Sequence, residues 1–207
     1  MRIVLMGPPA SGKGTQATVL TNRFSIPKIS TGDMLREARA RATDLGKEAE
    51  LYMNSGRLVP DSVVVGLVEN RISLPDAGAG FVLDGFPRTV PQAKALGDLL
   101  ARVGNPLDVV VQIDVARELL VERATLRRMD RHTGQIYHLK YNPPPAGVEV
   151  VQREDDREET VKRRLDEYDT MTSALIPFYS ALGLLRRVDG VGVPESVAER
   201  MMAAIGK

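Results

Sequence analysis

The amino terminus of this chain carries the feature that most constrains its fold. A short apolar run, Ile3–Met6, leads into the segment GPPASGKGT, which extends from Gly7 to Thr15. A helical spacing of apolar residues follows at once, with Ala17 and Leu20 on one face. Glycines let backbone N–H groups curl around an anion, and the next helix directs its positive end to the same place. Strand, glycine loop, lysine and helix in this order predict a phosphate-binding loop.

The hydrophobic periodicity predicts an α/β fold around a parallel sheet. Short apolar runs rich in β-branched residues, typical of strands buried on both faces, predict strands at Ile3–Met6, Phe81–Asp84 and Val109–Ile113. Leu184–Val188 is a further predicted strand, and Pro27–Ser30 is a weaker one. Helical patterns cover Ser62–Leu74, Val90–Val103, Ala116–Leu126, Arg157–Leu182 and Pro194–Ile205. Strands that alternate with helices indicate a doubly wound, five-stranded parallel sheet with helices on both faces.

Two segments interrupt this alternation. The first, Thr31 to Pro60, contains helical patterns and no convincing strand. The second, Arg127 to Asp156, is polar and rich in turns, with short strand patches at Gln135–Lys140 and Val148–Val151. Structureless loops of this length are uncommon in compact domains. Both segments are therefore predicted to be folded insertions on the core.

Composition excludes several classes of protein. The 207 residues, 43% of them hydrophobic, suit one compact domain, and 28 basic against 27 acidic residues argue against a broad nucleic-acid surface. No cysteine is present, so disulfides and thiolate metal sites are excluded. No apolar run approaches the roughly 20 residues that a membrane helix needs. We expect a cytoplasmic protein without membrane or nucleic-acid partners.

Two acids and two arginines are candidate site residues. Asp84 ends a predicted buried strand, where an acid beside a phosphate loop can hold Mg²⁺ directly or through water. Arg88 follows at the carboxyl edge of the sheet, where ligands of open α/β folds bind. Asp33 lies at a predicted helix start that Ser30 caps, and Arg36 lies one turn further on.

Further basic residues point to the same chemistry. Arg123 and Arg127 are four residues apart and are predicted to share one helical face, where they repel each other unless an anion lies across them. Arg164 belongs to a second basic cluster. A phosphate loop, a strand-end acid and several arginines are typical of phosphoryl transfer. His132 and His138 have too few partners for a structural zinc site.

Taken together, the motifs resemble the adenylate kinases of the long bacterial type. They occur in that family's order and span nearly the whole chain. The matching segments are Gly7–Gln16, Ser30–Arg36, Gly56–Asp61, Leu83–Thr89 with Gln92, Ile136–Pro144, Arg153–Asp156 and Arg164.

The resemblance implies the reaction ATP + AMP ⇌ 2 ADP with Mg²⁺, carried out by a monomer. It implies a core (1–29, 60–125 and 158–207), an AMP-binding helical flap (30–59) and a small β-rich lid over ATP (126–157). The implied ATP-binding residues are Gly7, Ala10, Ser11, Gly12, Lys13, Gly14, Thr15, Arg123, Arg127, Ile136, Tyr137 and Gly192. The implied AMP-binding residues are Thr31, Arg36, Arg57, Leu58, Val59, Gly85, Phe86, Pro87, Arg88, Gln92, Arg153 and Arg164. Lys13, Arg88, Arg123, Arg153 and Arg164 would be catalytic, and Asp84 and Asp33 would order the Mg²⁺ waters.

Three departures from the family pattern carry their own expectations. Ala10 replaces a common loop glycine, so we expect an ordinary backbone conformation with negative φ there. Leu126 replaces a glycine at the start of the lid and is expected to stiffen that hinge. The lid lacks the four zinc cysteines of other members, and Asp130 with Thr133 at the first pair's positions predicts a hydrogen-bonded substitute without structural zinc.

Two other functions remain open at this point. A related kinase with a pyrimidine acceptor would share most of these motifs, although Thr31 and the long lid argue against it. A nucleotide-dependent switch or binding module would share the phosphate loop. The chain has no Asn-Lys-x-Asp motif for reading a guanine base, and it retains all the arginines.

Overall fold

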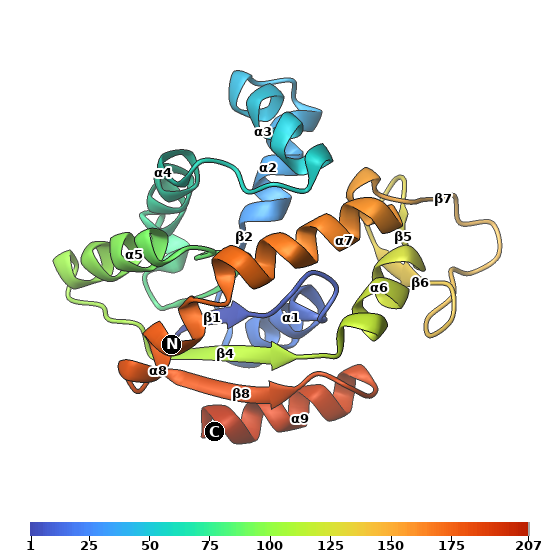
Figure 1. Ribbon diagram of the computed structural model, residues 1–207. Helices are drawn as coiled ribbons and strands as arrows, with labels where there is room; N and C mark the ends of the chain where they lie inside the picture. Colours follow the sequence, from blue (N-terminus) through green and yellow to red (C-terminus); the bar gives the residue numbers. More distant parts are fainter. Residues whose placement is uncertain (207) are drawn as a thin grey trace.

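A five-stranded parallel sheet forms the centre of the computed structural model, which describes residues 1–206 (Figure 1). The strand order is β2-β3-β1-β4-β8. The strands are β1 (Arg2–Met6), β2 (Lys28–Ser30), β3 (Phe81–Asp84), β4 (Val109–Asp114) and β8 (Leu185–Asp189). All five predicted strands are confirmed, as is the doubly wound class. Lys207, the last residue of the predicted core, lies outside the described residues.

A helix follows each strand of the five-stranded sheet along the chain. The helices are α1 (Lys13–Phe24), α2 (Thr31–Ala40), α3 (Asp44–Ser55), α4 (Asp61–Ile72), α5 (Val90–Arg102), α6 (Arg117–Thr125), α7 (Glu158–Glu167), α8 (Leu175–Ala181) and α9 (Pro194–Ile205). Within residues 31–60 the structure has helices α2 and α3 and no strand, as predicted. In the part of the chain from 1 to 206, no helix combines the length and the apolar character that crossing a membrane requires.

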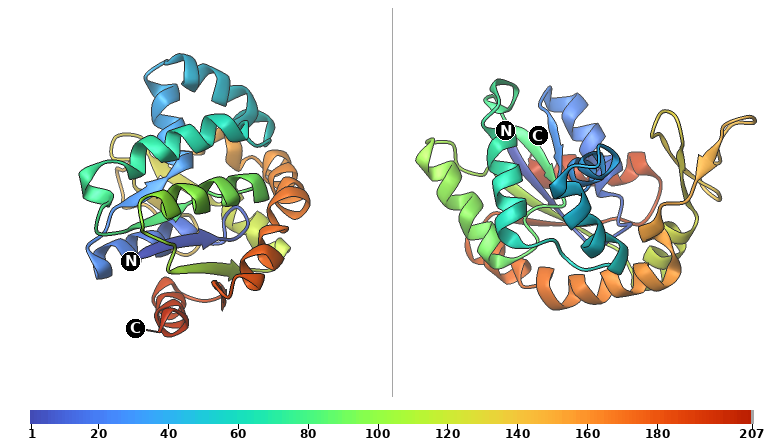
Figure 2. Two further views of the ribbon diagram at one scale, coloured as in Figure 1. Left: turned by 90° about the vertical axis from the view of Figure 1, so that its left-hand side faces the viewer. Right: turned by 90° about the horizontal axis from the view of Figure 1, so that it is seen from above.

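Both faces of the sheet are buried. Val4 and Met6 of β1 pack in a cluster with residues of α2, α4, α5 and α8. Ile3 and Leu5 point the other way, into a cluster with residues of α1, α6, α7 and α9. Figure 2 shows helices on both sides of the sheet. Since alternate side chains of one strand face opposite ways, a doubly covered sheet needs apolar residues at successive positions, as at Ile3–Met6 of β1 and Val109–Val111 of β4.

The predicted helix Arg157–Leu182 is wrong as one unit. Helix α7 ends in a π-helical turn at Tyr168–Thr172, and α8 starts anew at Leu175. The cause lies at Pro177, which would clash with the carbonyl four residues earlier in a continuous helix. As the third residue of α8, it occupies a position that needs no intrahelical N–H donor.

A second, antiparallel sheet lies apart from the first, at the right of Figure 1. Its order is β6-β5-β7, with β5 at Arg127–Asp130, β6 at Ile136–His138 and β7 at Val150–Val151. The two predicted patches are confirmed as β6 and β7, within narrower bounds. Strand β5 was not predicted from the sequence, because its charged residues lack an alternating apolar pattern.

Candidate active site

The phosphate-binding loop connects β1 to α1. Gly7 and Gly12 adopt φ values of +149° and +97°, and a Cβ on Gly7 would lie 2.7 Å from the Ile113 carbonyl oxygen. Lys13 starts α1, and its Nζ donates to the carbonyl oxygens of Gly7 and Pro8, both at 2.8 Å. The loop thus has the predicted strand–loop–helix context, and its lysine folds back over it.

The expectation for Ala10 is wrong. Its φ is +63°, in the left-handed region, although the residue carries a Cβ. The curl of the loop demands this conformation, which costs an L-residue roughly 1–2 kcal/mol. Ala10 packs against the apolar cluster on the α1 side of the sheet, which provides contacts that a glycine would lack.

Replacing Ala10 with glycine is expected to stabilise the protein by about 0.5–1 kcal/mol. The relief of left-handed strain outweighs the extra entropy that glycine adds to the unfolded chain. Urea unfolding measures the change. The control is Ala101→Gly on the exposed side of α5. This change is expected to lower the free energy of unfolding by about 1 kcal/mol, because glycine is a poor helix former. Equal destabilisation by both changes would contradict the strain at Ala10.

Lys13 lies among charged groups of both signs. Burial lowers the pKa of the Lys13 ammonium to about 8, and the positive charges of Arg88 and Arg164 lower it as well. The attraction of Asp84 acts in the opposite direction. Without an anion, the loop is therefore an unfavourable place for this charge. An incoming phosphate would remove that penalty.

The pKa of Lys13 makes a pH-dependent prediction. Below about pH 8 the free protein carries the charged lysine, and above it the proton is lost. We expect kcat/KM for ATP, which reports the free enzyme, to fall as the pH rises above about 8. Lys13→Arg, which stays charged, should show a flat profile over the same range, at lower activity. A flat profile to pH 9.5 in the unmodified protein would contradict the assignment.

Residues after β3 form a second polar region. Gly85 has φ of +82°, and its carbonyl oxygen accepts hydrogen bonds from Thr31 Oγ1 at 2.9 Å and Arg88 Nε at 2.8 Å. Gln92 accepts from the Arg88 backbone N–H at 2.7 Å and donates to Asp61 Oδ1 at 2.7 Å. The Phe86–Pro87 peptide bond is cis, and Phe86 is buried. The structure thus brings Thr31, Gly85, Arg88 and Gln92 together, as the sequence interpretation requires.

The predicted residues between α3 and α4 make other contacts. The exposed Arg57 lies over the Tyr52 ring, 5.6 Å from its centroid, and donates to Ser55 Oγ. Val59 is buried in the core, and the Leu58 N–H faces the Glu167 carboxylate. None of these contacts joins the three residues to Arg88 within the described chain.

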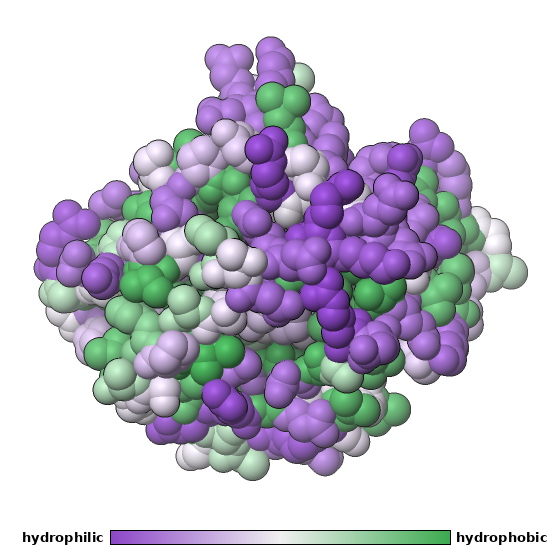
Figure 3. All heavy atoms as spheres, viewed as in Figure 1, coloured by the Kyte–Doolittle hydropathy of each residue, from purple (hydrophilic) through white to green (hydrophobic). Residues whose placement is uncertain are grey.

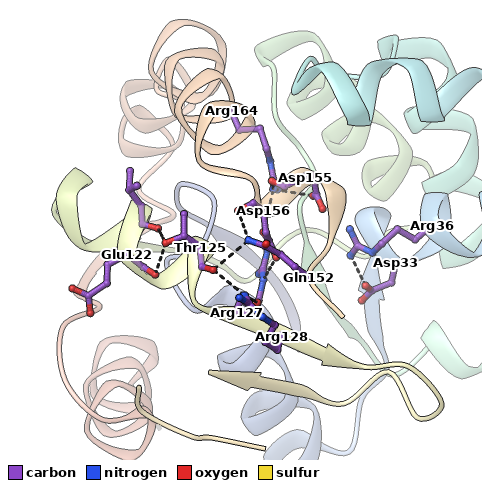
Figure 4. Close-up of polar contacts among 11 residues, drawn as sticks. Asp33, Arg36, Glu122, Thr125, Arg127, Arg128, Gln152, Asp155, Asp156 and Arg164 are labelled. Carbon is purple, nitrogen blue, oxygen red and sulfur yellow. Dashed lines mark hydrogen bonds and ion pairs between the residues drawn. The ribbon is translucent and has the colours of Figure 1, made fainter. Parts of the chain in front are cut away.

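Two buried carboxylates hold two arginines where the antiparallel sheet meets α7 (Figure 4). Asp156 is fully buried and accepts two hydrogen bonds from Arg127 of β5. Asp155 pairs with Arg164 of α7 at 2.8 Å, and Arg164 Nη1 also lies 3.9 Å from Asp156. The attraction of Asp156 outweighs burial and raises the pKa of Arg127.

The shared helical face predicted for Arg123 and Arg127 is wrong. Helix α6 ends at Thr125, and Arg127 pairs in β5 opposite His138. Register with β6 and the buried Asp156 decide the position of Arg127, whereas Arg123 donates to the Gly190 carbonyl oxygen at 3.0 Å. Each of the two guanidinium groups therefore has its own partner within the protein.

Burial and neighbouring positive charges disfavour the charged forms of two arginines in this region. Burial and the charges of Arg164 and Arg36 lower the pKa of Arg88 to about 10, against the attraction of Asp84. Burial and the charges of Arg36 and Arg127 lower the pKa of Arg153 to about 10. Arg153 Nε is buried and has no hydrogen-bond partner within residues 1–206. A polyanion between these groups would satisfy them.

The loop after β8 is held by two helices. Arg123 reaches it from α6, and Arg200 of α9 donates to the carbonyl oxygens of Asp189 and Val191. Gly192 in this loop has φ of +119° and lies against the Arg200 guanidinium. Sequence reasoning missed Arg200, because no motif contains it.

The start of the lid segment is ordered by hydrogen bonds. Asp130 Oδ1 accepts from the backbone N–H groups of His132 at 2.7 Å and Thr133 at 2.9 Å, which is the predicted hydrogen-bonded substitute. Leu126 has ordinary right-handed φ and ψ of −91° and −2°. Ile136 is exposed on β6, and Tyr137 beside it is half-buried. Over residues 1–206, no group of three or more His, Asp or Glu side chains is arranged to hold a metal ion.

A parallel sheet with a phosphate loop and converging arginines defines a kinase of the phosphate-loop class. The model of the family described as adenylate kinase matches residues 5–184. The chain is similar to the adenylate kinases of Sorangium cellulosum (57% identity), Moorella thermoacetica (49%) and Archaeoglobus fulgidus (46%). Each alignment covers 100% of this chain and 97%, 99% and 99% of the relative, respectively. The chain belongs to the adenylate kinase family.

Proposed function

We propose that this protein catalyses the reversible transfer of a phosphoryl group from ATP to AMP, which yields two ADP. The observation that carries this proposal is a phosphate-binding loop with the Lys13 ammonium folded onto it, together with Arg88 fixed by the Gly85 carbonyl oxygen and a buried Arg153 Nε without a hydrogen-bond partner in residues 1–206. Two nucleotides facing each other through their phosphates are the polyanion that such a set fits. The family membership supports the same reaction.

The donor nucleotide is assigned to the loop between β1 and α1. Backbone N–H groups of the loop and the positive end of α1 favour its phosphates. Lys13 would exchange its two carbonyl contacts for phosphate oxygens. The full set proposed for ATP is Gly7, Ala10, Ser11, Gly12, Lys13, Gly14, Thr15, Arg123, Arg127, Ile136, Tyr137 and Gly192.

The acceptor nucleotide is assigned to the region around Gly85. The Arg88 side chain is preoriented by the hydrogen bond from its Nε to the Gly85 carbonyl oxygen, so little side-chain entropy is lost when it binds a phosphate, and its backbone N–H is held by Gln92. Arg36 and Thr31 come from the adjacent helix α2. The full set proposed for AMP is Thr31, Arg36, Arg57, Leu58, Val59, Gly85, Phe86, Pro87, Arg88, Gln92, Arg153 and Arg164.

Transfer itself needs positioning and charge neutralisation, without a covalent intermediate on the protein. Lys13, Arg88, Arg123, Arg153 and Arg164 are the groups proposed to stabilise the charge on the moving phosphoryl group. Asp155 and Asp156 hold Arg164 and Arg127 so that their guanidinium planes are fixed before substrate arrives.

The residues beside the loop also fit Mg²⁺. The Asp84 carboxylate is 13% exposed and lies against Gly14, and Asp33 lies nearby on α2. Mg²⁺ prefers carboxylate and water oxygens and keeps several waters, so these two acids suit an outer position around a hydrated ion. When bound with ATP, the ion supplies charge neutralisation at the phosphate oxygens.

We also propose that the segments 30–59 and 126–157 act as a flap over AMP and a lid over ATP, on a core made of the remaining residues. Adenylate kinase lids are established examples of closure that excludes water from the reacting groups. The separate antiparallel sheet of the lid and the two helices α2 and α3 of the flap support this division. A cytoplasmic monomer is the form expected for this enzyme.

A panel of acceptors tests the proposed function. With Mg-ATP as donor, we expect AMP to be phosphorylated much faster than CMP, UMP or GMP, as measured by ADP formation in a coupled assay. Preference for CMP or UMP would instead indicate a pyrimidine nucleotide kinase. ATP binding with no ADP formed from any acceptor would indicate a binding module, and either result would overturn the proposal.

A further inference from the structure

Lys28 is a cation beside the phosphate loop that no motif in the sequence includes. It lies on β2 opposite Val82 of β3, two residues before the Ser30–Asp84 pair. Cross-strand partners share a face, and so do residues two apart on one strand, so Lys28 and Asp84 lie on the same face of the sheet. A lysine stem is long enough to reach along that face towards the carboxyl edge.

The Lys28 ammonium lies between the two carboxylates assigned to the Mg²⁺ waters. Its Nζ is 3.5 Å from Asp33 Oδ2 and 3.8 Å from Asp84 Oδ2. A Cβ built on Gly14 would lie 3.6 Å from Asp84 Oδ2 and 3.7 Å from Lys28 Nζ. Lys28 and Asp84 therefore meet directly against the residue that follows the loop lysine, and Asp33 joins them through Lys28.

The other cations near Asp33 and Asp84 do not bridge the two carboxylates as Lys28 does. Arg36 contacts Asp33 through the opposite oxygen, Oδ1, at 2.5 Å. Lys13 is attracted to Asp84 but directs its Nζ to the loop carbonyls of Gly7 and Pro8. Among the side chains that the structure describes, Lys28 makes the ion pairs that join the two carboxylates.

We propose that Lys28 is a positioning residue that neutralises Asp33 and Asp84 when no divalent cation is bound, and that it competes with the hydrated cation for these two carboxylates. The proposal rests on the assignment of these two acids to Mg²⁺. Two neighbouring carboxylates repel each other without a cation, and an ammonium point charge holds them in place. The Lys28 side chain is 29% exposed, so it can swing into solvent when the hydrated ion arrives with ATP.

Mn²⁺ binding tests this competition without turnover. The protein is saturated with ATP in the absence of any acceptor, and Mn²⁺ binding is followed by the relaxation enhancement of water protons. For Lys28→Met we expect half-saturation at a roughly 3- to 10-fold lower Mn²⁺ concentration, the size of one screened charge at a partly exposed site. Lys28→Arg keeps the charge and is expected to bind Mn²⁺ as the unmodified protein does.

Two further variants make the result decisive. Lys162→Met removes the same charge from an exposed pair with Glu158 on α7, and it should leave Mn²⁺ binding unchanged. Asp84→Asn should weaken Mn²⁺ binding. If it does not, the assignment of the metal to Asp84 fails. If Asp84→Asn weakens binding while Lys28→Met leaves it unchanged or weaker, the metal assignment stands and the competition by Lys28 is overturned.

Discussion

Replacing Arg88 with alanine is expected to lower kcat/KM for AMP by roughly 10²-fold or more. The Arg88 side chain is fixed by the Gly85 carbonyl oxygen, and its pKa, lowered to about 10 by burial and by Arg164 and Arg36, shows that its charge lacks a full counter-ion. An acceptor phosphate would supply that counter-ion, and most strongly as charge shifts in the transition state. Initial rates at varied AMP and saturating Mg-ATP measure the effect.

A matched change at the end of α5, the helix that follows Arg88, controls for the loss of an arginine. Arg102 at the end of α5 is 68% exposed and lies 3.5 Å from Glu69. Arg102→Ala is expected to leave kcat/KM within a factor of two, because exposed pairs contribute little. AMP phosphorylation by Arg88→Ala at a near-normal rate would remove Arg88 from the site.

Asp156→Ala is expected to destabilise the fold by about 3 kcal/mol. This carboxylate is fully buried and accepts two hydrogen bonds from the Arg127 guanidinium, with Arg164 close by. Removing it leaves buried positive charge without a partner, and this costs more than the pair itself contributes. Urea unfolding followed by circular dichroism gives the free energy of unfolding.

Asp166 offers the matched comparison for Asp156. It pairs with Arg117 at 2.6 Å, but the carboxylate is 68% exposed and Arg117 also holds Asp169. Asp166→Ala is expected to cost less than about 1 kcal/mol. Similar decreases in the free energy of unfolding for the two variants would contradict the view that the burial of Asp156 makes its ion pair important.

Hydrophilic residues dominate the face that α3 and α7 present (Figure 3). The sequence interpretation of α7 contained one error, because it continued this helix to Leu182. The spacing of apolar residues in Arg157–Leu182 indicates that one side of the helix is buried, as at Val161 and Leu165, but it does not reveal where the helix breaks. A π-helical turn keeps a similar pattern, so the break before Pro177 is visible in the hydrogen bonds and hardly in the spacing.

Local rules also failed at Ala10 and at Arg127. The Cβ of Ala10 favours negative φ, but the phosphate loop requires a left-handed residue there and the surrounding structure imposes it. Arg127 continues the helical spacing of Arg123, yet pairing with β6 and the buried Asp156 places it in a strand. In both cases contacts from distant parts of the chain outweigh a preference of about 1 kcal/mol.

The sequence by itself determined the phosphate loop, the parallel sheet and the resemblance to a family, because these features depend on side chains near in sequence and on the periods of strand and helix. Only the tertiary structure decided which charges meet. Arg127 pairs with Asp156, Lys28 reaches Asp84, and Arg123 binds the loop at Gly190, each across more than 25 residues. Ion pairing depends on distance in space and on burial, and neither quantity is written in local spacing.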